Sequence, residues 1–146
     1  MTPGRLYAIT DPRIEESRHV RWMNVARKLA KTSLFPQERM GCVLVAPGGR
    51  LISRGTNQAK SGYLKNKNYT VNQAHHSELA AVLNANKDSV RGSTAYVAGY
   101  TPNKSEDMPC WSSRPCEGCQ AMLREYGVKY AVFHDRVGNL YKYKVS

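Results

Sequence analysis

The chain has 146 residues, which predicts a single domain spanning residues 1–146 with a core large enough to need no disulfides. It carries 22 Lys and Arg against 11 Asp and Glu, and this net charge of +11 favours an anionic partner. No segment is long and apolar enough to span a membrane, and we expect no signal peptide. Four cysteines, two of them in a C-x-x-C pair, favour metal binding in a reducing compartment, so we expect a cytoplasmic protein.

The first third of the chain predicts an arm and then a helix. Residues 1–17 contain two prolines and a glycine without a hydrophobic period, which indicates an irregular N-terminal arm. Residues 19–31 have apolar side chains at helical spacing and predict an amphipathic helix. The other side of this helix is either an ordinary solvated surface or a phosphate-facing one, and it carries Arg18, Arg21, Arg27, Lys28 and Lys31.

Three strands are expected in the middle of the chain. Residues 40–46 form a short continuous apolar run, a Pro-Gly-Gly turn follows, and residues 50–54 return as a second strand. Residues 94–98 predict a third. Asn57 follows the second strand, where an Asn is most simply part of a turn.

The segment 58–73 is polar and rich in lysine and tyrosine. A long loop inside a compact domain is uncommon and often functional. Lys60 and Tyr63 combine a charge for a phosphate with a flat face for a base, so they are candidate substrate contacts. A flexible surface loop is the alternative.

Two short stretches predict a metal site when they are taken together. The first is His76-Ser77-Glu78, and Pro115-Cys116-Glu117-Gly118-Cys119 follows after 36 intervening residues. Cysteines three apart share one face at a helix start, where the positive end of the helix favours thiolates, and a proline is tolerated in a first turn. With His76 they give three zinc ligands and an open fourth position, as in catalytic sites. Glu78 fits the carboxylate that moves a proton from a metal-activated water.

Other readings of these residues remain open. A C-x-x-C pair alone is also typical of redox sites and zinc knuckles. A structural zinc could be closed by Cys110 together with Cys116, Cys119 and His76, and that arrangement would leave Glu78 without a role. Trp111, Ser113 and Arg114, just before the cysteines, are candidate contacts to a substrate base or phosphate.

The C-terminal region predicts a hairpin. After a helix from Cys116 to about Tyr126, only 20 residues remain. A parallel crossover needs a dozen or more residues between strands, so residues 128–134 and 140–145 must pair antiparallel. Lys142 and Lys144 would then protect an exposed sheet edge.

The sequence resembles the cytidine deaminase-like superfamily from about His19 to Val145. The resemblance rests on the H-x-E and P-C-x-x-C motifs and on the strand pair before them. The resemblance implies a three-layer α/β/α sandwich around a five-stranded mixed sheet. It also implies that zinc is bound by His76, Cys116 and Cys119, that Glu78 shuttles protons, and that Asn57 contacts the substrate ribose. Relatives commonly form homo-oligomers. His76, where enzymes acting on free cytidine usually have Cys, and the C-terminal hairpin leave the sub-branch open.

Three functions follow as hypotheses. The first is zinc-dependent deamination of a cytosine nucleoside or nucleotide, with the basic loops binding phosphate. The second is deamination of cytosine or adenine within single-stranded DNA or RNA, where the same charge would bind a backbone. The third is a non-catalytic, zinc-stabilised module that binds nucleic acid.

Overall fold

The computed structural model describes residues 6–8, 16–34, 39–59, 74–100, 112–136 and 138–145. Six strands form one sheet in the order β1-β8-β7-β6-β2-β3. They are β1 (Leu6–Ala8), β2 (Arg39–Val45), β3 (Leu51–Thr56), β6 (Thr94–Tyr100), β7 (Tyr130–His134) and β8 (Leu140–Lys144). A separate two-stranded sheet pairs β4 (Gln58–Ala59) with β5 (Ala74–His75). The helices are α1 (Glu16–Lys31), α2 (Ser77–Leu83), α3 (Lys87–Val90) and α4 (Glu117–Glu125).

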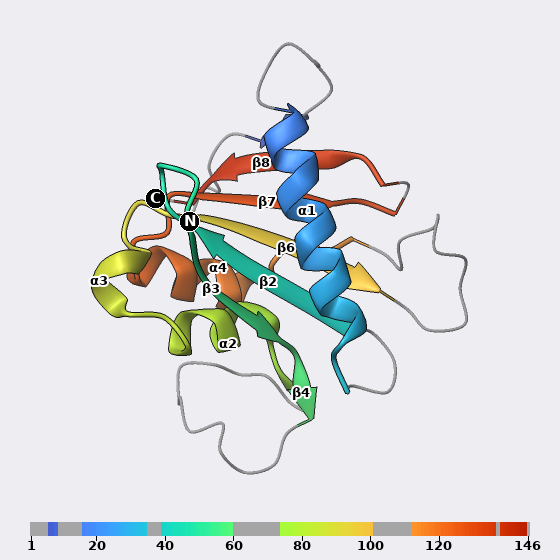
Figure 1. The fold of residues 1–146 in the computed structure, drawn as a ribbon, viewed down its shortest axis with the longest axis horizontal. Coiled ribbons are helices and arrows are strands. Elements are labelled where there is room, and N and C mark those ends of the chain that lie inside the picture. The colour runs from blue at the N-terminus through green and yellow to red at the C-terminus, as the bar shows by residue number, and fades with distance from the viewer. Residues whose placement is uncertain are drawn as a thin grey trace.

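The five strands that the sequence predicted form the body of this sheet (Figure 1). β6 and β7 pair in parallel, while the other neighbouring pairs are antiparallel, so the sheet is mixed. β7 and β8 form the antiparallel hairpin expected from the short C-terminal segment. The α/β fold with a five-stranded mixed core is therefore confirmed.

The N-terminal arm differs from the prediction. Residues 6–8 form β1, which pairs antiparallel with β8 and places Leu6 opposite Tyr143. The sequence does not predict this strand, because three residues are too few to show the alternation of apolar and polar side chains that is typical of a strand. β8 is consequently an inner strand, and its lysines do not protect an open edge as we had expected. The first helix also begins at Glu16, within the segment predicted to be irregular.

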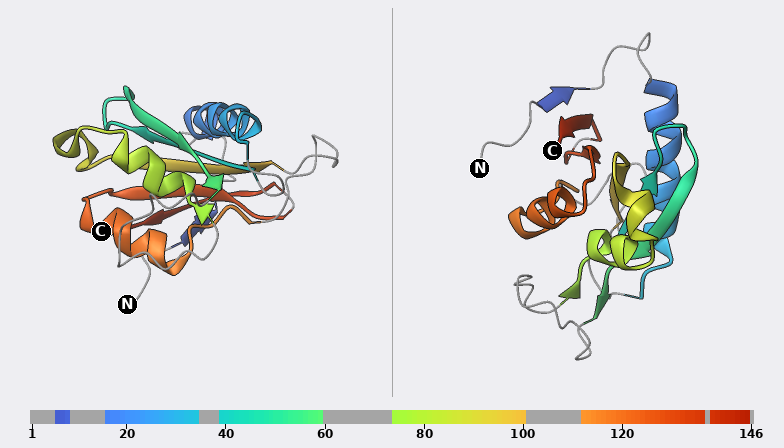
Figure 2. Two further views of the ribbon diagram at one scale, coloured as in Figure 1. Left: turned by 90° about the horizontal axis from the view of Figure 1, so that it is seen from below. Right: turned by 90° about the vertical axis from the view of Figure 1, so that its left-hand side faces the viewer.

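The helices cover both faces of the sheet (Figure 2). α1 packs on β2 and β6 on one face, while α2 packs on β2 and β3, and α4 lies beside α2 on the other. The strand residues alternate accordingly: Val43 and Tyr96 belong to the core under α1, whereas Leu44 and Val97 belong to the core under α2 and α4. Among the described residues, no helix has the length and apolar character needed to cross a bilayer.

Gly55 sets how closely α2 approaches the sheet. A Cβ atom at Gly55 would overlap the backbone of Ala80 and Ala81 in α2, so only glycine fits at this contact. Ser53, two residues earlier on β3, donates a hydrogen bond from Oγ to the Ala81 carbonyl oxygen at 2.7 Å. The glycine and this hydrogen bond together fix α2, whose first turn carries Glu78, against β3.

Replacing Gly55 by Ala is expected to destabilise the protein by about 3 kcal/mol, since overpacking a closely packed contact costs one to several kcal/mol. Urea denaturation measures this change. Gly48→Ala is the control, because a Cβ there meets no atom within 4 Å. Equal stability of the two variants would contradict the close approach of α2.

Candidate metal centre and active site

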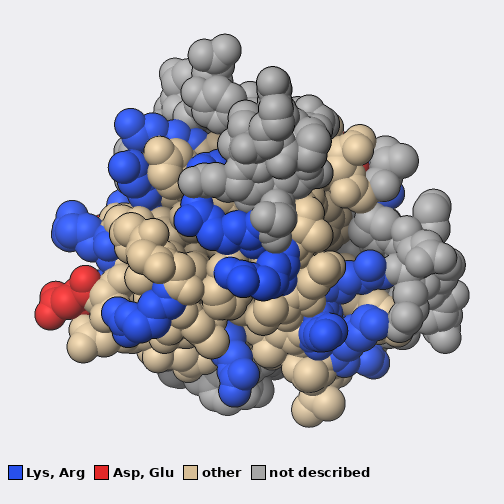
Figure 3. Space-filling view, turned by 45° about the horizontal axis from the view of Figure 1, so that its top comes forward, with Lys and Arg blue, Asp and Glu red and all other residues tan. Residues whose placement is uncertain are grey.

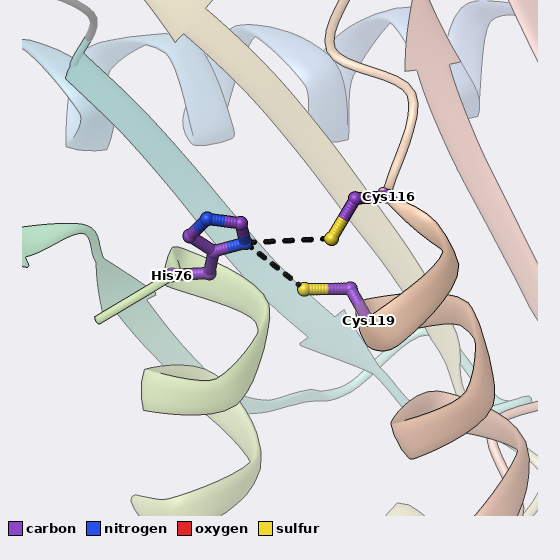
Figure 4. A group of neighbouring side chains, drawn as sticks. All are labelled: His76, Cys116 and Cys119. Carbon is purple, nitrogen blue, oxygen red and sulfur yellow. Dashed lines mark hydrogen bonds between the residues drawn. The ribbon is translucent and has the colours of Figure 1, made fainter. Parts of the chain in front are cut away.

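The three predicted ligands meet where two helices begin (Figure 4). His76 is the N-cap residue of α2, Cys116 is the N-cap residue of α4, and Cys119 lies in the first turn of α4. His76 Nδ1 is 3.3 Å from Cys119 Sγ and 3.7 Å from Cys116 Sγ. The ligand atoms of the three residues all lie within 4.8 Å of one another. Pro115 precedes the N-cap, so it stands just outside the helix and not in its first turn.

The surroundings favour a thiolate at this position. Hydrogen bonds from Cys119 and from His76 lower the pKa of Cys116 to about 4, against an opposing effect of burial. Burial lowers the pKa of His76, but the hydrogen bond with Cys116 and the negative charges of Glu78 and Cys116 raise it overall. The N-terminal end of α4 adds positive potential at both cysteines. The group thus combines one imidazole with the readily ionised thiol of Cys116 and the second sulfur of Cys119.

The geometry fits zinc. Zn–N bonds near 2.0–2.1 Å and Zn–S bonds near 2.3 Å at tetrahedral angles would hold nitrogen and sulfur about 3.5 Å apart. The two observed N–S distances, 3.3 and 3.7 Å, bracket this value. No carboxylate belongs to the group within the described part of the chain. Cys110, the fourth ligand of the structural alternative, lies outside the described residues.

Glu78 is buried beside this group. Its side chain is 4% exposed, and its Oε1 accepts a hydrogen bond from Ser77 Oγ at 2.8 Å. Burial raises the pKa of the Cys42 thiol, and the charge of Glu78 raises it further. The same charge contributes to the raised pKa of His76. Buried carboxylates are rare unless they have a partner or a function. Glu78 is near the metal ligands without being one of them, as a proton-transfer group requires.

Asn57 is brought next to the ligands by the small sheet. β4 and β5 pair Gln58 with His75, so the residues that flank this pair, Asn57 and His76, are also neighbours. Asn57 is 5% exposed, and its Oδ1 accepts hydrogen bonds from Ser33 Oγ and the Met40 backbone N–H, each at 2.8 Å. These contacts fix the orientation of the amide. Asn57 thus links β3 to β4 and holds Ser33 and Met40 through its side chain, in place of the turn that the local sequence suggests.

Ser113 has a different place from the one we expected. β6 and β7 pair only as far as Tyr96 and Val132, and Ser113 lies between the strands beyond that point. Its Oγ donates to the Val97 carbonyl oxygen at 2.7 Å and accepts from the His134 N–H at 2.8 Å. The residue is 1% exposed, so its hydroxyl anchors the segment before α4 and is not presented to a substrate.

His134 completes this anchor in its neutral form. The Gly99 N–H donates to its Nε2 at 3.0 Å, so the ring proton is on Nδ1, which lies 3.0 Å from the Asp135 carbonyl oxygen. Burial lowers the pKa of His134 from its ordinary value of 6.5, against the hydrogen bond to Asp135, and the charge of Arg27 lowers it further.

Acid is therefore expected to weaken the fold through His134. The unfolded chain binds this proton more readily, so the stabilisation is complete above about pH 6.5 and is lost as the pH falls toward the lowered pKa. Gln at position 134 can still accept from Gly99 but does not titrate. Urea denaturation between neutral pH and pH 5 should show a smaller loss of stability for His134→Gln than for the wild type. If the free energy of unfolding fell equally with pH in both proteins, the neutral, stabilising role of His134 would be contradicted.

Tyr143 carries a buried hydroxyl that no other described group satisfies. The residue is 2% exposed, and its OH has no hydrogen-bond partner in the described structure. Tyr143 is paired with Ala131, and Ala131 with Ala95, so two small side chains leave room for its ring on that face. Burial and the charge of Glu78 raise the pKa of Tyr143, so the hydroxyl stays neutral.

Tyr143→Phe is expected to stabilise the protein by about 1 kcal/mol, because it removes an unsatisfied buried hydroxyl without changing the ring. The matched control is Tyr141→Phe, since the Tyr141 hydroxyl donates to Asp135 Oδ2 at 3.0 Å. Thermal and urea unfolding should rank Tyr143→Phe above the wild type and Tyr141→Phe at or below it. The reverse order would mean that the Tyr143 hydroxyl has a partner.

The remaining predicted residues divide into two groups. Arg114 is exposed, and its guanidinium lies 5.9 Å from the centre of the Phe133 ring. Lys60, Tyr63 and Trp111 lie outside the described residues, and their roles stay predictions.

The sequence did not predict the roles of Ser77 and Ser33, which donate hydrogen bonds to Glu78 and Asn57. Ser77 adjoins Glu78 in the chain and could have been suspected, whereas nothing local marks Ser33.

Comparison with known proteins agrees with this arrangement. The family described as "Cytidine and deoxycytidylate deaminase zinc-binding region" matches residues 16–135. No curated protein matches significantly. Cytidine deaminase from Burkholderia pseudomallei superimposes with a TM-score of 0.62 at 18% identity, covering 87% of this chain and 92% of that one. The dCMP deaminase of cyanophage S-TIM5, in complex with dCMP and dUMP, gives 0.53 at 21% identity, with 82% and 79% covered.

The fold and the His-Cys-Cys group together define a zinc-binding α/β protein of the cytidine deaminase-like fold. Since the family match spans most of its length, the chain belongs to the cytidine and deoxycytidylate deaminase zinc-binding region family.

Proposed function

We propose that the protein hydrolytically deaminates cytosine in a nucleoside or nucleotide, giving the uracil product and ammonia. The observation that carries the proposal is the group formed by His76, Cys116 and Cys119 with Glu78 buried beside it. A structural zinc site has no need of a buried carboxylate that is not a ligand. A hydrolytic site needs one to move protons.

His76, Cys116 and Cys119 would hold the zinc, which when bound makes a water nucleophilic near neutral pH. Glu78 accepts a proton as the water oxygen bonds to C4 of the base, and Ser77 keeps the carboxylate in place. Glu78 passes this proton to the ring nitrogen N3 and then carries the second proton of the same oxygen to the amino nitrogen at C4. The C4–N bond breaks, ammonia leaves, and the oxygen from water remains as the uracil carbonyl.

The substrate contacts follow from neighbouring residues. We assign Asn57 to the ribose, and the support for this is that Ser33 and Met40 fix the orientation of its amide. Arg114 lines a hollow of about 740 Å³ that also has Cys116 and Arg124 on its walls. We assign Arg114 to a terminal phosphate, because one guanidinium group can donate two parallel hydrogen bonds to two oxygens of the same phosphate. This assignment favours a nucleotide over a nucleoside.

A second candidate is deamination of cytosine or adenine within a single strand, which the net charge of +11 favours. Ammonia release by the zinc-loaded protein tests both, with cytidine, deoxycytidine, CMP, dCMP and a single-stranded oligonucleotide offered in parallel. Turnover of a mononucleotide alone supports the first proposal, and turnover of the oligonucleotide alone supports the second. No release from any of them, with zinc bound, would contradict cytosine as the base and leave adenine or a modified base to be tried.

A further inference from the structure

Basic side chains gather on the face of the sheet that α1 covers. α1 carries five Lys and Arg residues between positions 18 and 31, and its one acidic residue is Glu16 at its first position. β8 adds Lys142 and Lys144 to this face, because Tyr141 and Tyr143, which alternate with them, point into the opposite core. Figure 3 shows many Lys and Arg side chains and few Asp or Glu side chains on this side of the molecule.

The acidic residues with described side chains lie elsewhere. Glu78 is buried at the metal centre under the opposite face. The others belong to α3, to α4 and to the turn between β7 and β8, and they are Asp88, Glu117, Glu125 and Asp135. Among the side chains that the structure describes, the acidic ones therefore lie away from the basic residues of α1.

Aromatic rings lie among these cations. Tyr130 on β7 is half-buried, and the amino groups of Lys142 and Lys129 lie 4.4 and 5.4 Å from the centre of its ring. Lys144 is its partner across the β7–β8 pair. At the other side of the face, the Arg21 guanidinium lies 5.8 Å from the centre of the Trp22 ring on α1. α1 packs mainly on β2 and β6, which leaves Tyr130 and its lysines beside the helix and not beneath it.

This combination fits a polyanion with exposed bases. Like charges held close together repel one another, and a chain of phosphates would relieve that repulsion along the whole face. Arg21 and Lys28 are seven residues apart, hence about 10 Å apart along one side of α1. Rings flanked by cations suit a single strand, whose bases are open to stacking, better than a duplex, whose bases are already stacked and paired.

We propose that the α1 face, consisting of the basic residues of α1 with Lys129, Tyr130, Lys142 and Lys144, binds single-stranded nucleic acid. The metal centre lies on the other side of the sheet, between the starts of α2 and α4. Binding at the α1 face is therefore separate from the proposed deamination, and it does not depend on which substrate the metal centre accepts. A free nucleotide should not compete with it.

Fluorescence anisotropy with a labelled oligothymidylate tests the proposal, because thymine offers no amino group to the metal centre. The variant combines Arg21→Gln, Lys28→Gln and Lys144→Gln, and its control combines Arg50→Gln, Lys87→Gln and Arg91→Gln. All six side chains are exposed, and both sets remove the same charge. Circular dichroism and zinc content establish that each variant is folded.

The α1-face variant should bind at least about tenfold more weakly than the wild type, and the slope of log affinity against log salt should fall by roughly 2, about 0.7 for each lost contact. The control should keep most of the wild-type affinity. Equal losses in both variants would show that only net charge matters and would overturn the proposal. Tighter binding to a duplex, or binding to anionic vesicles but not to the oligonucleotide, would also overturn it.

Discussion

Glu78→Gln is expected to lower kcat for ammonia release at least about a hundredfold, because a positioned acid–base group contributes about a hundred- to ten-thousandfold to rate. Glutamine keeps the size of the side chain, and its carbonyl oxygen can still accept the hydrogen bond that Ser77 donates at 2.8 Å. It cannot take up a proton from water. Zinc content and unfolding should therefore change little while turnover is lost, which steady-state ammonia release and metal analysis can measure together.

The matched control is Glu125→Gln, which makes the same change at an exposed carboxylate on the last residue of α4. It should leave turnover within a few-fold of the wild type. If Glu78→Gln retained full activity, Glu78 would not be the proton-transfer group. If neither the wild type nor the variants released ammonia from any base while all bound zinc, the non-catalytic zinc module would be favoured instead.

Cys119→Ser is expected to lose most of the bound zinc and, with it, the activity. Cys119 is fully buried, and its sulfur is 3.3 Å from His76 Nδ1, so as a zinc ligand it would join the start of α4 to the start of α2. A serine hydroxyl is a poorer zinc ligand than a thiolate and does not ionise near neutral pH. Because metal binding is coupled to folding, the variant should also unfold at a lower temperature.

Cys42→Ser provides the control, since Cys42 is equally buried but lies on β2 outside the ligand group. It should lose some stability through the buried hydroxyl and keep its zinc. Metal analysis of dialysed protein separates the two variants. A Cys119→Ser protein with one zinc per chain would show that the three residues do not form the metal site.

The sequence by itself predicted the three residues of the metal-ligand group, the carboxylate beside them and the C-terminal hairpin. Ligands that are close in the chain can be recognised from their spacing. Cys116 and Cys119 are close in space because they are three residues apart at the start of a helix that the local sequence favours. The hairpin followed from the short connection between β7 and β8, residues 135–139, which is too short for a parallel crossover.

Only the tertiary structure decided which side chains support those groups. Asn57 becomes a neighbour of His76 through the pairing of β4 with β5, and Ser33 fixes its amide across 24 residues of chain. Ser113 is an anchor and not a substrate contact because β6 and β7 separate beside it. Such hydrogen bonds depend on where strands pair and diverge. Residue type and local spacing do not specify that geometry, because a serine or an asparagine can make equally good hydrogen bonds in many folds.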